Sequence, residues 1–258
     1  MNFKTMHRLF ILLLAFFLAS CQSPVPVSTP AGDEAMPATS TVLPLEAVNS
    51  FLADYEFPTS IDPLKRYMFY LHGRIIEDQG LPAVSSDFGE YQYEAILQKL
   101  ESHGFEVISE QRPKDTNGDQ YARSVAKQVK TLIDSGVPPE NITVVGASKG
   151  AGIAAIVSSL AENTELNFVL LGFCSPDTVE ELVKNQMVLN GNVLAVRDSA
   201  DDLSGSCQEL FDTSAGRGLG RHNEIVLNIG MRHGILYKPL DEWIQPTVEW
   251  AKDCPCDE

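Results

Sequence analysis

Short apolar stretches alternate along the chain with longer stretches of mixed polarity. Several of the short stretches are almost uniformly apolar, which is typical of strands that helices cover on both faces of a sheet. We therefore expect six strands, at residues 67–71, 106–109, 142–145, 168–171, 193–196 and 224–229.

The longer stretches between these strands have the periodicity of helices. In one of them, Tyr121, Val125, Val129 and Leu132 recur at intervals of three and four residues, which puts them on one helical face. We expect helices at residues 91–102, 120–135, 149–160, 178–184 and 240–252. Alternating strands and helices predict an α/β fold, a mostly parallel sheet with helices on both faces. The glycine-rich segment 197–221 is expected to be a long connection, of the kind that is often functional.

The first twenty residues predict a signal peptide. Lys4 and Arg8 precede an apolar run that is too short to be a comfortable membrane span. The sequence that ends in Cys21, Leu-Ala-Ser-Cys, resembles the lipobox of bacterial lipoproteins. This resemblance implies a palmitate-bearing Cys21 at the mature N-terminus and a lipid-anchored protein of the bacterial cell envelope. Because Gln22 is not the aspartate that retains such proteins at the inner membrane, the outer membrane is favoured, on its periplasmic side or at the cell surface. The alternative is an ordinary secretory signal.

Residues 21–45 are rich in proline, serine, threonine and alanine and contain few bulky apolar residues. Such a segment cannot bury enough surface to order itself, so we expect a disordered tether. Residues 46–258 are expected to form one domain, since 44% of the 258 residues are hydrophobic. With 35 acidic and 19 basic residues the chain has a net charge of −16, which disfavours nucleic acid as a partner. We expect a monomer.

Four cysteines follow Cys21, and an exported protein meets oxidising conditions. Cys254 and Cys256 are separated by a single residue, and a disulfide between them would be strained. We therefore expect a disulfide between Cys174 and Cys207 and leave the pairing of the last two cysteines open. A metal site is not expected, because no histidine lies near these cysteines at a zinc-like spacing.

Ser148 is the candidate nucleophile. It stands in Gly-Ala-Ser-Lys-Gly, between an expected strand and a helix that begins with small residues, which is the context of a nucleophile elbow. Gly146 and Gly150 would let the strand and helix backbones pass closely. The alternative is a glycine-rich turn that binds an anion or only reverses the chain.

A serine nucleophile needs a general base, and His233 is the candidate. His233 follows the last expected strand, where catalysts of open α/β sheets gather. His103 is at the end of a helix and is not expected to be the base. His222 lies at the start of the last strand, away from the carboxyl edge of the sheet where catalysts gather. His72 follows the first strand in His-Gly and is expected to anchor that loop.

The base needs a carboxylate that orients it. Asp198 directly follows an expected strand and gives the chain order Ser148, Asp198, His233. Asp201, Asp202 and, more distantly, Asp177 are competing candidates. We assign the oxyanion hole to two backbone N–H groups, those of Lys149 and Arg74.

With these residues in place, segment 67–250 resembles the α/β-hydrolase superfamily, and segment 233–250 is similar to the C-terminal signature of a bacterial group known only as α/β-hydrolases. The resemblance implies the α/β-hydrolase fold and a serine hydrolase mechanism. The chain departs from many esterases in having Lys149 after the nucleophile, and it has no insertion long enough for a large lid.

An esterase acting on a small acyl compound is the function expected from this pattern, with an amidase, a peptidase or an acyltransferase as further possibilities. A different class of function is a non-catalytic envelope lipoprotein that uses the fold as a binding module, with Lys149 or segment 197–221 filling the site. No cofactor is implied, because the chain lacks a phosphate-binding Gly-x-x-x-x-Gly-Lys and its Gly-x-Gly-x-Gly at 216–220 follows no expected strand.

Overall fold

The computed structural model describes residues 54–252. The expected signal peptide, Cys21, the tether, Cys254 and Cys256 lie outside the described residues. Among the described residues, no helix is both long enough and apolar enough to cross a membrane.

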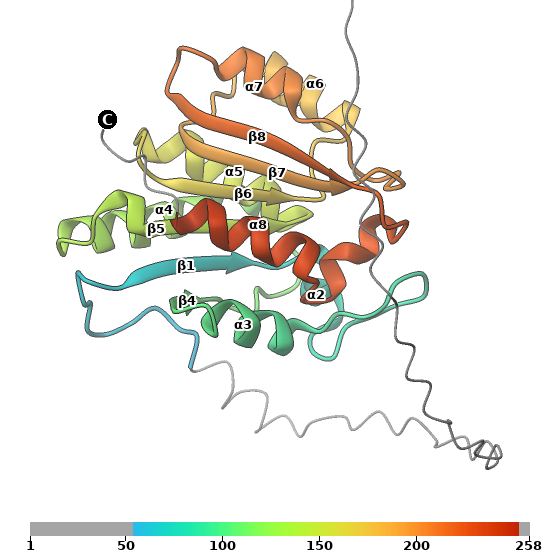
Figure 1. The fold of residues 1–258 in the computed structure, drawn as a ribbon, viewed down its shortest axis with the longest axis horizontal. Helices are drawn as coiled ribbons and strands as arrows, with labels where there is room; N and C mark the ends of the chain where they lie inside the picture. The colour runs from blue at the N-terminus through green and yellow to red at the C-terminus, as the bar shows by residue number, and fades with distance from the viewer. Residues whose placement is uncertain (1–53, 253–258) are drawn as a thin grey trace, which may run out of the picture. The chain divides into compact units, whose positions relative to one another are not determined.

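A parallel sheet of six strands forms the centre of the domain (Figure 1). Its order is β4-β1-β5-β6-β7-β8, and every neighbouring pair is parallel. The six expected strands are all confirmed, although the last begins earlier than expected. Their bounds are β1 (Arg66–Leu71), β4 (Phe105–Ile108), β5 (Ile142–Ala147), β6 (Asn167–Leu171), β7 (Gly191–Asp198) and β8 (Leu219–Leu227).

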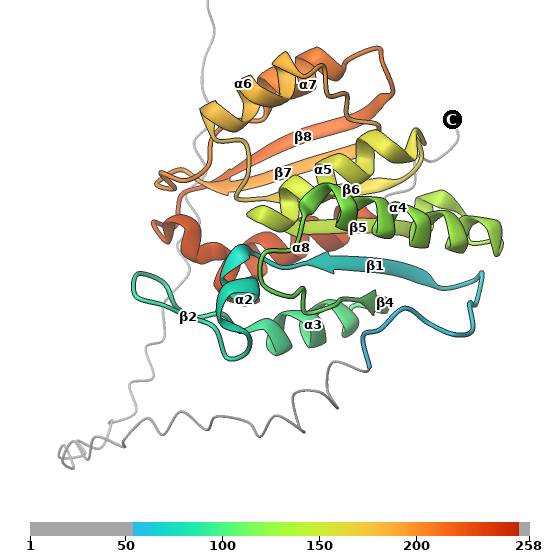
Figure 2. The ribbon, with the colours of Figure 1, turned by 180° about the vertical axis from the view of Figure 1, so that it is seen from behind.

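Helices cover both faces of the sheet. The five expected helices are confirmed as α3 (Tyr93–Glu101), α4 (Gly118–Asp134), α5 (Lys149–Ala161), α6 (Pro176–Lys184) and α8 (Asp241–Lys252). Alternate residues of β1 point to opposite faces: Phe69 belongs to the core on the side of α4 and α5, whereas Tyr70 belongs to the core on the side of α3 and α8. Figure 1 shows α8 on the near side of the sheet. Figure 2, the view from behind, shows α4 and α5 on the opposite side. The expected α/β architecture is therefore present.

Several short elements escaped the sequence prediction. They are α2 (Arg74–Gln79), the hairpin of β2 (Val84–Ser85) and β3 (Gly89–Glu90), the 3₁₀ turns η1 (Pro139–Asn141) and η2 (Arg232–Tyr237), and α7 (Gln208–Ser214). The expectation of one long connection at 197–221 is wrong, because the segment contains α7 and the first residues of β8. Helices this short show little periodicity, and tertiary packing stabilises them.

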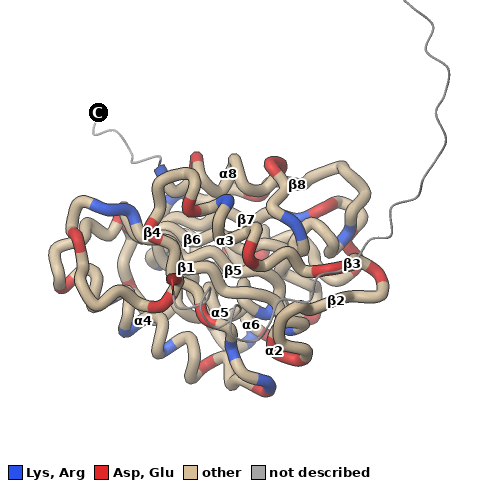
Figure 3. The backbone as a smooth tube through the Cα atoms, turned by 90° about the horizontal axis from the view of Figure 1, so that it is seen from below, with Lys and Arg blue, Asp and Glu red and all other residues tan. Residues whose placement is uncertain are grey.

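The expected disulfide between Cys174 and Cys207 is confirmed. It links the turn after β6 to the residue that precedes α7, with Cα atoms 5.2 Å apart, and both cysteines are buried. Acidic and basic residues are interspersed over the domain (Figure 3).

The strand order creates a switch point between β1 and β5. After β1 the chain runs through α2 and the β2–β3 hairpin to α3, which covers one face of the sheet together with α8. After β5 it enters α5 on the other face. Neighbouring strands whose connections diverge in this way open a crevice at their carboxyl ends, where ligands of α/β sheets bind.

Candidate active site

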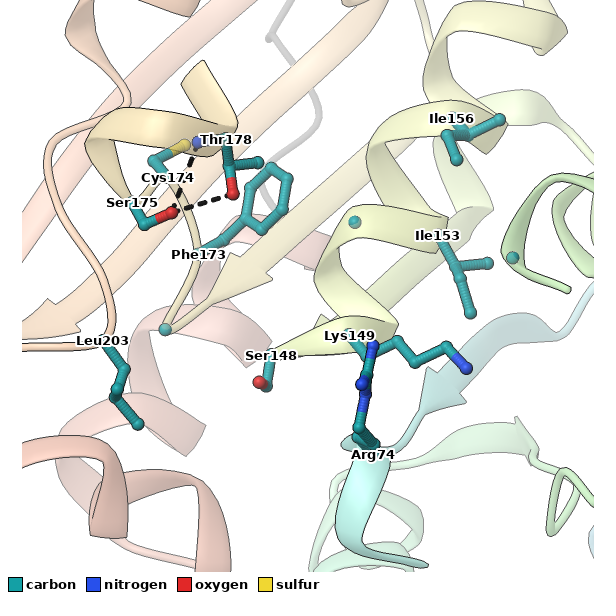
Figure 4. A pocket seen from close by; sticks show the side chains of 13 residues that line it. Arg74, Ser148, Lys149, Ile153, Ile156, Phe173, Cys174, Ser175, Thr178 and Leu203 are labelled. Atoms are coloured by element: carbon teal, nitrogen blue, oxygen red, sulfur yellow. Dashed lines mark hydrogen bonds between the residues drawn. The ribbon is translucent and has the colours of Figure 1, made fainter. Parts of the chain in front are cut away.

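Ser148 occupies a strained turn between β5 and α5. Its φ of 53° and ψ of −117° are uncommon for a residue with a side chain, and strain of this kind is concentrated at functional sites. Its backbone N–H donates to Leu171 O at 2.9 Å, which ties the turn to the end of β6. Among the described residues, Ser148 Oγ has no hydrogen-bond partner, and Figure 4 shows it pointing away from α5. The hydroxyl is therefore accessible to a substrate.

The two glycines of the motif are required by close backbone contacts. A Cβ on Gly146 would lie 2.2 Å from Gly150 O, and one on Gly150 would lie 1.9 Å from Leu71 O. No side chain larger than hydrogen fits at either position, because these neighbours are backbone atoms. The expectation that the glycines let β5 and α5 approach closely is confirmed, and the close approach of Gly150 to β1 was not expected.

The structure brings His233 to the end of β6, the same strand end that binds Ser148. A Cβ on Gly172 would lie 3.1 Å from His233 Cε1, so this glycine leaves room for the imidazole. The ring is buried, and Phe88 from the β2–β3 hairpin lies 6.3 Å from it, centroid to centroid. His233 Nδ1 is 2.7 Å from Asp201 Oδ2. With the Nδ1 proton donated to the carboxylate, Nε2 of the neutral ring is an acceptor.

Asp201 contacts His233, and Asp198 does not. The expectation that Asp198 is the carboxylate in contact with His233 is therefore wrong. Asp198 is the last residue of β7 and is completely buried. Its carboxylate accepts the backbone N–H groups of Ala200 at 2.8 Å and of Ile229 and Met231 at 3.3 Å each. Asp198 thereby holds the turn after β7 and the loop that leads to His233.

The environment of Asp201 keeps its carboxylate ionised. Burial raises the pKa of Asp201, but the hydrogen bonds from His233 and from Ser204 Oγ, the latter at 2.7 Å, outweigh it and leave the pKa below its usual value. Two more aspartates considered as orienting acids do not contact His233. Asp202 is exposed and pairs with Arg232 at 2.6 Å, and Asp177 is in the first turn of α6.

The two expected oxyanion donors lie at the starts of two helices. Lys149 is the first residue of α5 and Arg74 is the first residue of α2, and the first N–H groups of a helix have no acceptor within it. A Cβ on Gly73, the residue before Arg74, would lie 3.7 Å from Ser148 Cβ, so the start of α2 adjoins Ser148. This arrangement suits a developing negative charge beside Ser148.

A buried ion network behind these donors was not predicted. Glu77 on α2 binds Arg112 Nε at 2.7 Å through Oε1 and Lys149 Nζ through Oε2. The side chains of Glu77 and Arg112 are 1% and 0% exposed. Lys149 Nζ also donates to Thr116 O at 2.9 Å. No sequence signal relates these residues, because the strand order alone brings α2, α5 and the segment after β4 together.

His72 has the anchoring role that its position suggested. Burial and the neighbouring Arg112 cation lower its pKa to about 3, so the ring is neutral. Its Nε2 accepts the backbone N–H of Arg112 at 2.9 Å, which leaves the proton on Nδ1 to donate to Gly73 O at 2.9 Å. His72 thus fixes the turn between β1 and α2.

A cavity of about 440 Å³ opens beside Ser148. Its walls include the apolar side chains of Ile153, Ile156, Phe173 and Leu203. Figure 4 shows Arg74 and Lys149 on one side of Ser148 and the start of α6 on the other, where Ser175 Oγ and Thr178 Oγ1 are 2.8 Å apart. The space fits a small or medium-sized substrate with an apolar portion.

Comparison with known proteins gives structural neighbours only. No family model and no curated protein matches the chain. The chain is similar to the solved structure of an arylesterase, at 15% identity and a TM-score of 0.49 over 80% of this chain and 88% of that one. It is also similar to an esterase/lipase from an uncultured bacterium, at 14% identity and a TM-score of 0.49 over 85% and 92% of the two chains. A sugar hydrolase from Lactococcus lactis has 14% identity and a TM-score of 0.48 over 77% and 91%.

The assignment of the fold rests on features of this chain. They are the parallel order β4-β1-β5-β6-β7-β8, the strained Ser148 between β5 and α5, and the His233–Asp201 pair in the loops after β8 and β7. By these features the chain has the α/β-hydrolase fold.

Proposed function

We propose that the protein is a serine hydrolase that cleaves an ester or a related acyl compound, with Ser148, His233 and Asp201 as its catalytic triad. The observation that carries the proposal is the position of Ser148: a strained, accessible serine between two helix starts, at the same strand end as a histidine that is bonded to a buried carboxylate. A glycine-rich turn that only reverses the chain requires none of these partners.

In the first step, Ser148 Oγ attacks the acyl carbonyl carbon while His233 Nε2 takes the hydroxyl proton. The carbonyl oxygen becomes an oxyanion that accepts hydrogen bonds from the N–H groups of Lys149 and Arg74. Asp201 stabilises the imidazolium. When the tetrahedral intermediate collapses, the bond to the leaving oxygen breaks and the imidazolium returns the proton to that oxygen, leaving an acyl-enzyme.

Water completes the cycle by the same route. His233 removes a proton from water, the resulting oxygen nucleophile attacks the acyl carbon, and Ser148 Oγ leaves with the proton that the imidazolium returns. The apolar walls at Ile153, Ile156 and Phe173 are suited to a modest acyl or alkyl portion. The site therefore supports small esters better than long lipid chains.

The geometry gives less support to a non-catalytic binding module. Such a module would have Lys149 or the segment after β7 filling the site. Lys149 Nζ is instead bound to Glu77 and Thr116 O, and its side chain leads away from Ser148 (Figure 4). Leu203 lines the cavity but leaves it open.

The deciding experiment is labelling of the purified protein with a fluorophosphonate probe, which reacts with activated serines. We expect the wild-type protein to be labelled, Ser148→Ala to be unlabelled and His233→Ala to be labelled far more slowly. Two matched controls, Ser135→Ala and His222→Ala, change an exposed serine and an exposed histidine away from the site and should label at the wild-type rate. A folded wild-type protein that remains unlabelled contradicts the proposal.

The N-terminal residues support a location for this activity. We expect the protein to be anchored to the cell envelope through a lipid on Cys21, with residues 21–45 as the tether. Growth with radiolabelled palmitate should label the wild-type protein in a bacterial host, and Cys21→Ser should abolish the label. A wild-type protein without label would favour the ordinary secretory signal.

A further inference from the structure

The cavity beside Ser148 contains positive charge and no negative charge. Among the described residues that line it, the ionisable side chains are Arg74 and Lys149, and none is Asp or Glu. This lining contrasts with the composition of the chain, in which 35 acidic residues outnumber 19 basic ones. The ionisable side chains that line the cavity are therefore opposite in sign to the net charge of the chain.

The charge of Lys149 is compensated inside the protein. Its Nζ binds the buried Glu77 carboxylate and Thr116 O, and its side chain is only 20% exposed. Glu77 also binds the fully buried Arg112, so its negative charge is already shared between two cations. Lys149 is consequently committed to the network, and each oxygen of Glu77 already has a cationic partner.

Arg74 has no such partner. Its side chain is exposed, and it forms no hydrogen bond or ion pair with any described residue. Glu77, three residues further along α2, is already bound to Arg112 and Lys149. Asp78, four residues further along, forms no ion pair with Arg74. In Figure 4 the guanidinium extends from α2 toward the start of α5, beside Ser148. It is a cation at the cavity with its donors available.

We propose that the Arg74 guanidinium binds a negatively charged group of the substrate, so that the protein prefers esters that carry an anion a few bonds from the scissile carbonyl. A guanidinium presents several N–H donors in a planar fork that matches a carboxylate or a phosphate. The N-terminus of α5, at Lys149, adds to the positive potential there. The anion can belong to the acyl portion or to the alcohol portion. This inference rests on the proposed serine hydrolase function.

The test uses two pairs of esters that differ in charge and little in size. For the acyl side, the mono-p-nitrophenyl ester of succinate is compared with its neutral methyl ester. For the alcohol side, 4-acetoxybenzoate is compared with its methyl ester. For each pair the measured quantity is the ratio of kcat/KM for the charged ester to that for the neutral one, which cancels effects common to both.

We expect one of the two ratios to be about fivefold higher in the wild-type protein than in Arg74→Gln. A change of this size corresponds to the interaction of one solvent-exposed ion pair. The difference should shrink in concentrated salt, where charges are strongly screened. Arg123→Gln is the matched control: it removes an exposed arginine of α4, outside the cavity lining, and should leave both ratios at their wild-type values.

The outcomes separate this inference from the function on which it rests. If Ser148 is labelled by the fluorophosphonate but neither ratio changes in Arg74→Gln, the anionic preference is refuted and the hydrolase remains. A change of equal size in Arg123→Gln also refutes it, since the effect then arises from net charge alone. If the folded wild-type protein is not labelled, the proposed function itself fails.

Discussion

The buried Glu77 carboxylate offers the sharpest test of the structure. Glu77→Gln keeps the size of the side chain and removes its charge. Arg112, whose side chain is fully buried, then has no counter-charge in contact among the described residues, and Lys149 loses its anionic partner. Removing one partner of a buried ion pair costs about 3–5 kcal/mol, because the remaining charge is neither solvated nor paired. The amide oxygen can still accept one hydrogen bond, so we expect a loss of about 3 kcal/mol.

The loss would be large against a total stability of about 5–15 kcal/mol for a domain. Urea unfolding, followed by the fluorescence of the two buried tryptophans, Trp243 and Trp250, measures it directly. Glu106→Gln is the matched control, since Glu106 pairs with Lys65 at the surface, where the side chains are 37% and 54% exposed. That variant should lose less than about 1 kcal/mol. If the two variants lose equal stability, the buried network does not hold α2 to α5 as described.

Three further predictions concern the site, the disulfide and His72. Asp201→Asn should lower kcat for an aryl ester by about 10⁴-fold with little loss of stability. Asp198→Asn should mainly lower the urea midpoint, because the Asp198 carboxylate accepts hydrogen bonds from backbone N–H groups. The reverse pattern would show that Asp198 is the orienting acid. Replacing both Cys174 and Cys207 by alanine opens a loop whose ends are 33 residues apart. The free energy of unfolding in urea should fall by about 4 kcal/mol. An unchanged urea midpoint would show that the disulfide does not stabilise the fold. His72 has a folded-state pKa of about 3 against a value of about 6.5 when unfolded, so between these pH values the unfolded chain binds the extra proton. Stability should therefore fall as the pH falls from about 6.5, by up to about 1.4 kcal/mol per pH unit, and His72→Gln should flatten this slope; an identical slope in both proteins would exclude His72 as its source.

The strands and long helices were predictable because their signals are local. A parallel strand that is covered on both faces must be apolar along its length, and β5 and β6 are largely so. The side chains of Val125 and Val129 recur at helical spacing because only one face of α4 is buried. Ser148 was found for the same reason, since its turn requires glycines at fixed positions next to it.

Prediction failed where a contact joins segments that are distant in sequence. Asp198 directly follows the apolar core of β7, so the sequence favoured it, but the strand continues to this residue and buries its carboxylate among backbone N–H groups. The turn that follows places Asp201 against His233, 32 residues further along the chain. Both aspartates lie at the same strand end, and nothing in the order of residues tells which one reaches the histidine.

The sequence by itself indicated the alternation of strands and helices and the glycine-flanked turn at Ser148, because each depends on the types and spacing of nearby residues. The expectation of the Cys174–Cys207 disulfide came from the cysteines of the whole chain, and the structure confirms it. Only the tertiary structure decided which carboxylate contacts His233, that Glu77 and Arg112 lie behind Lys149, and that Arg74 lines the cavity without a partner among the described residues. These features depend on the order of strands in the sheet. That order is set by the packing of the whole domain, in which β1 comes to lie between β4 and β5.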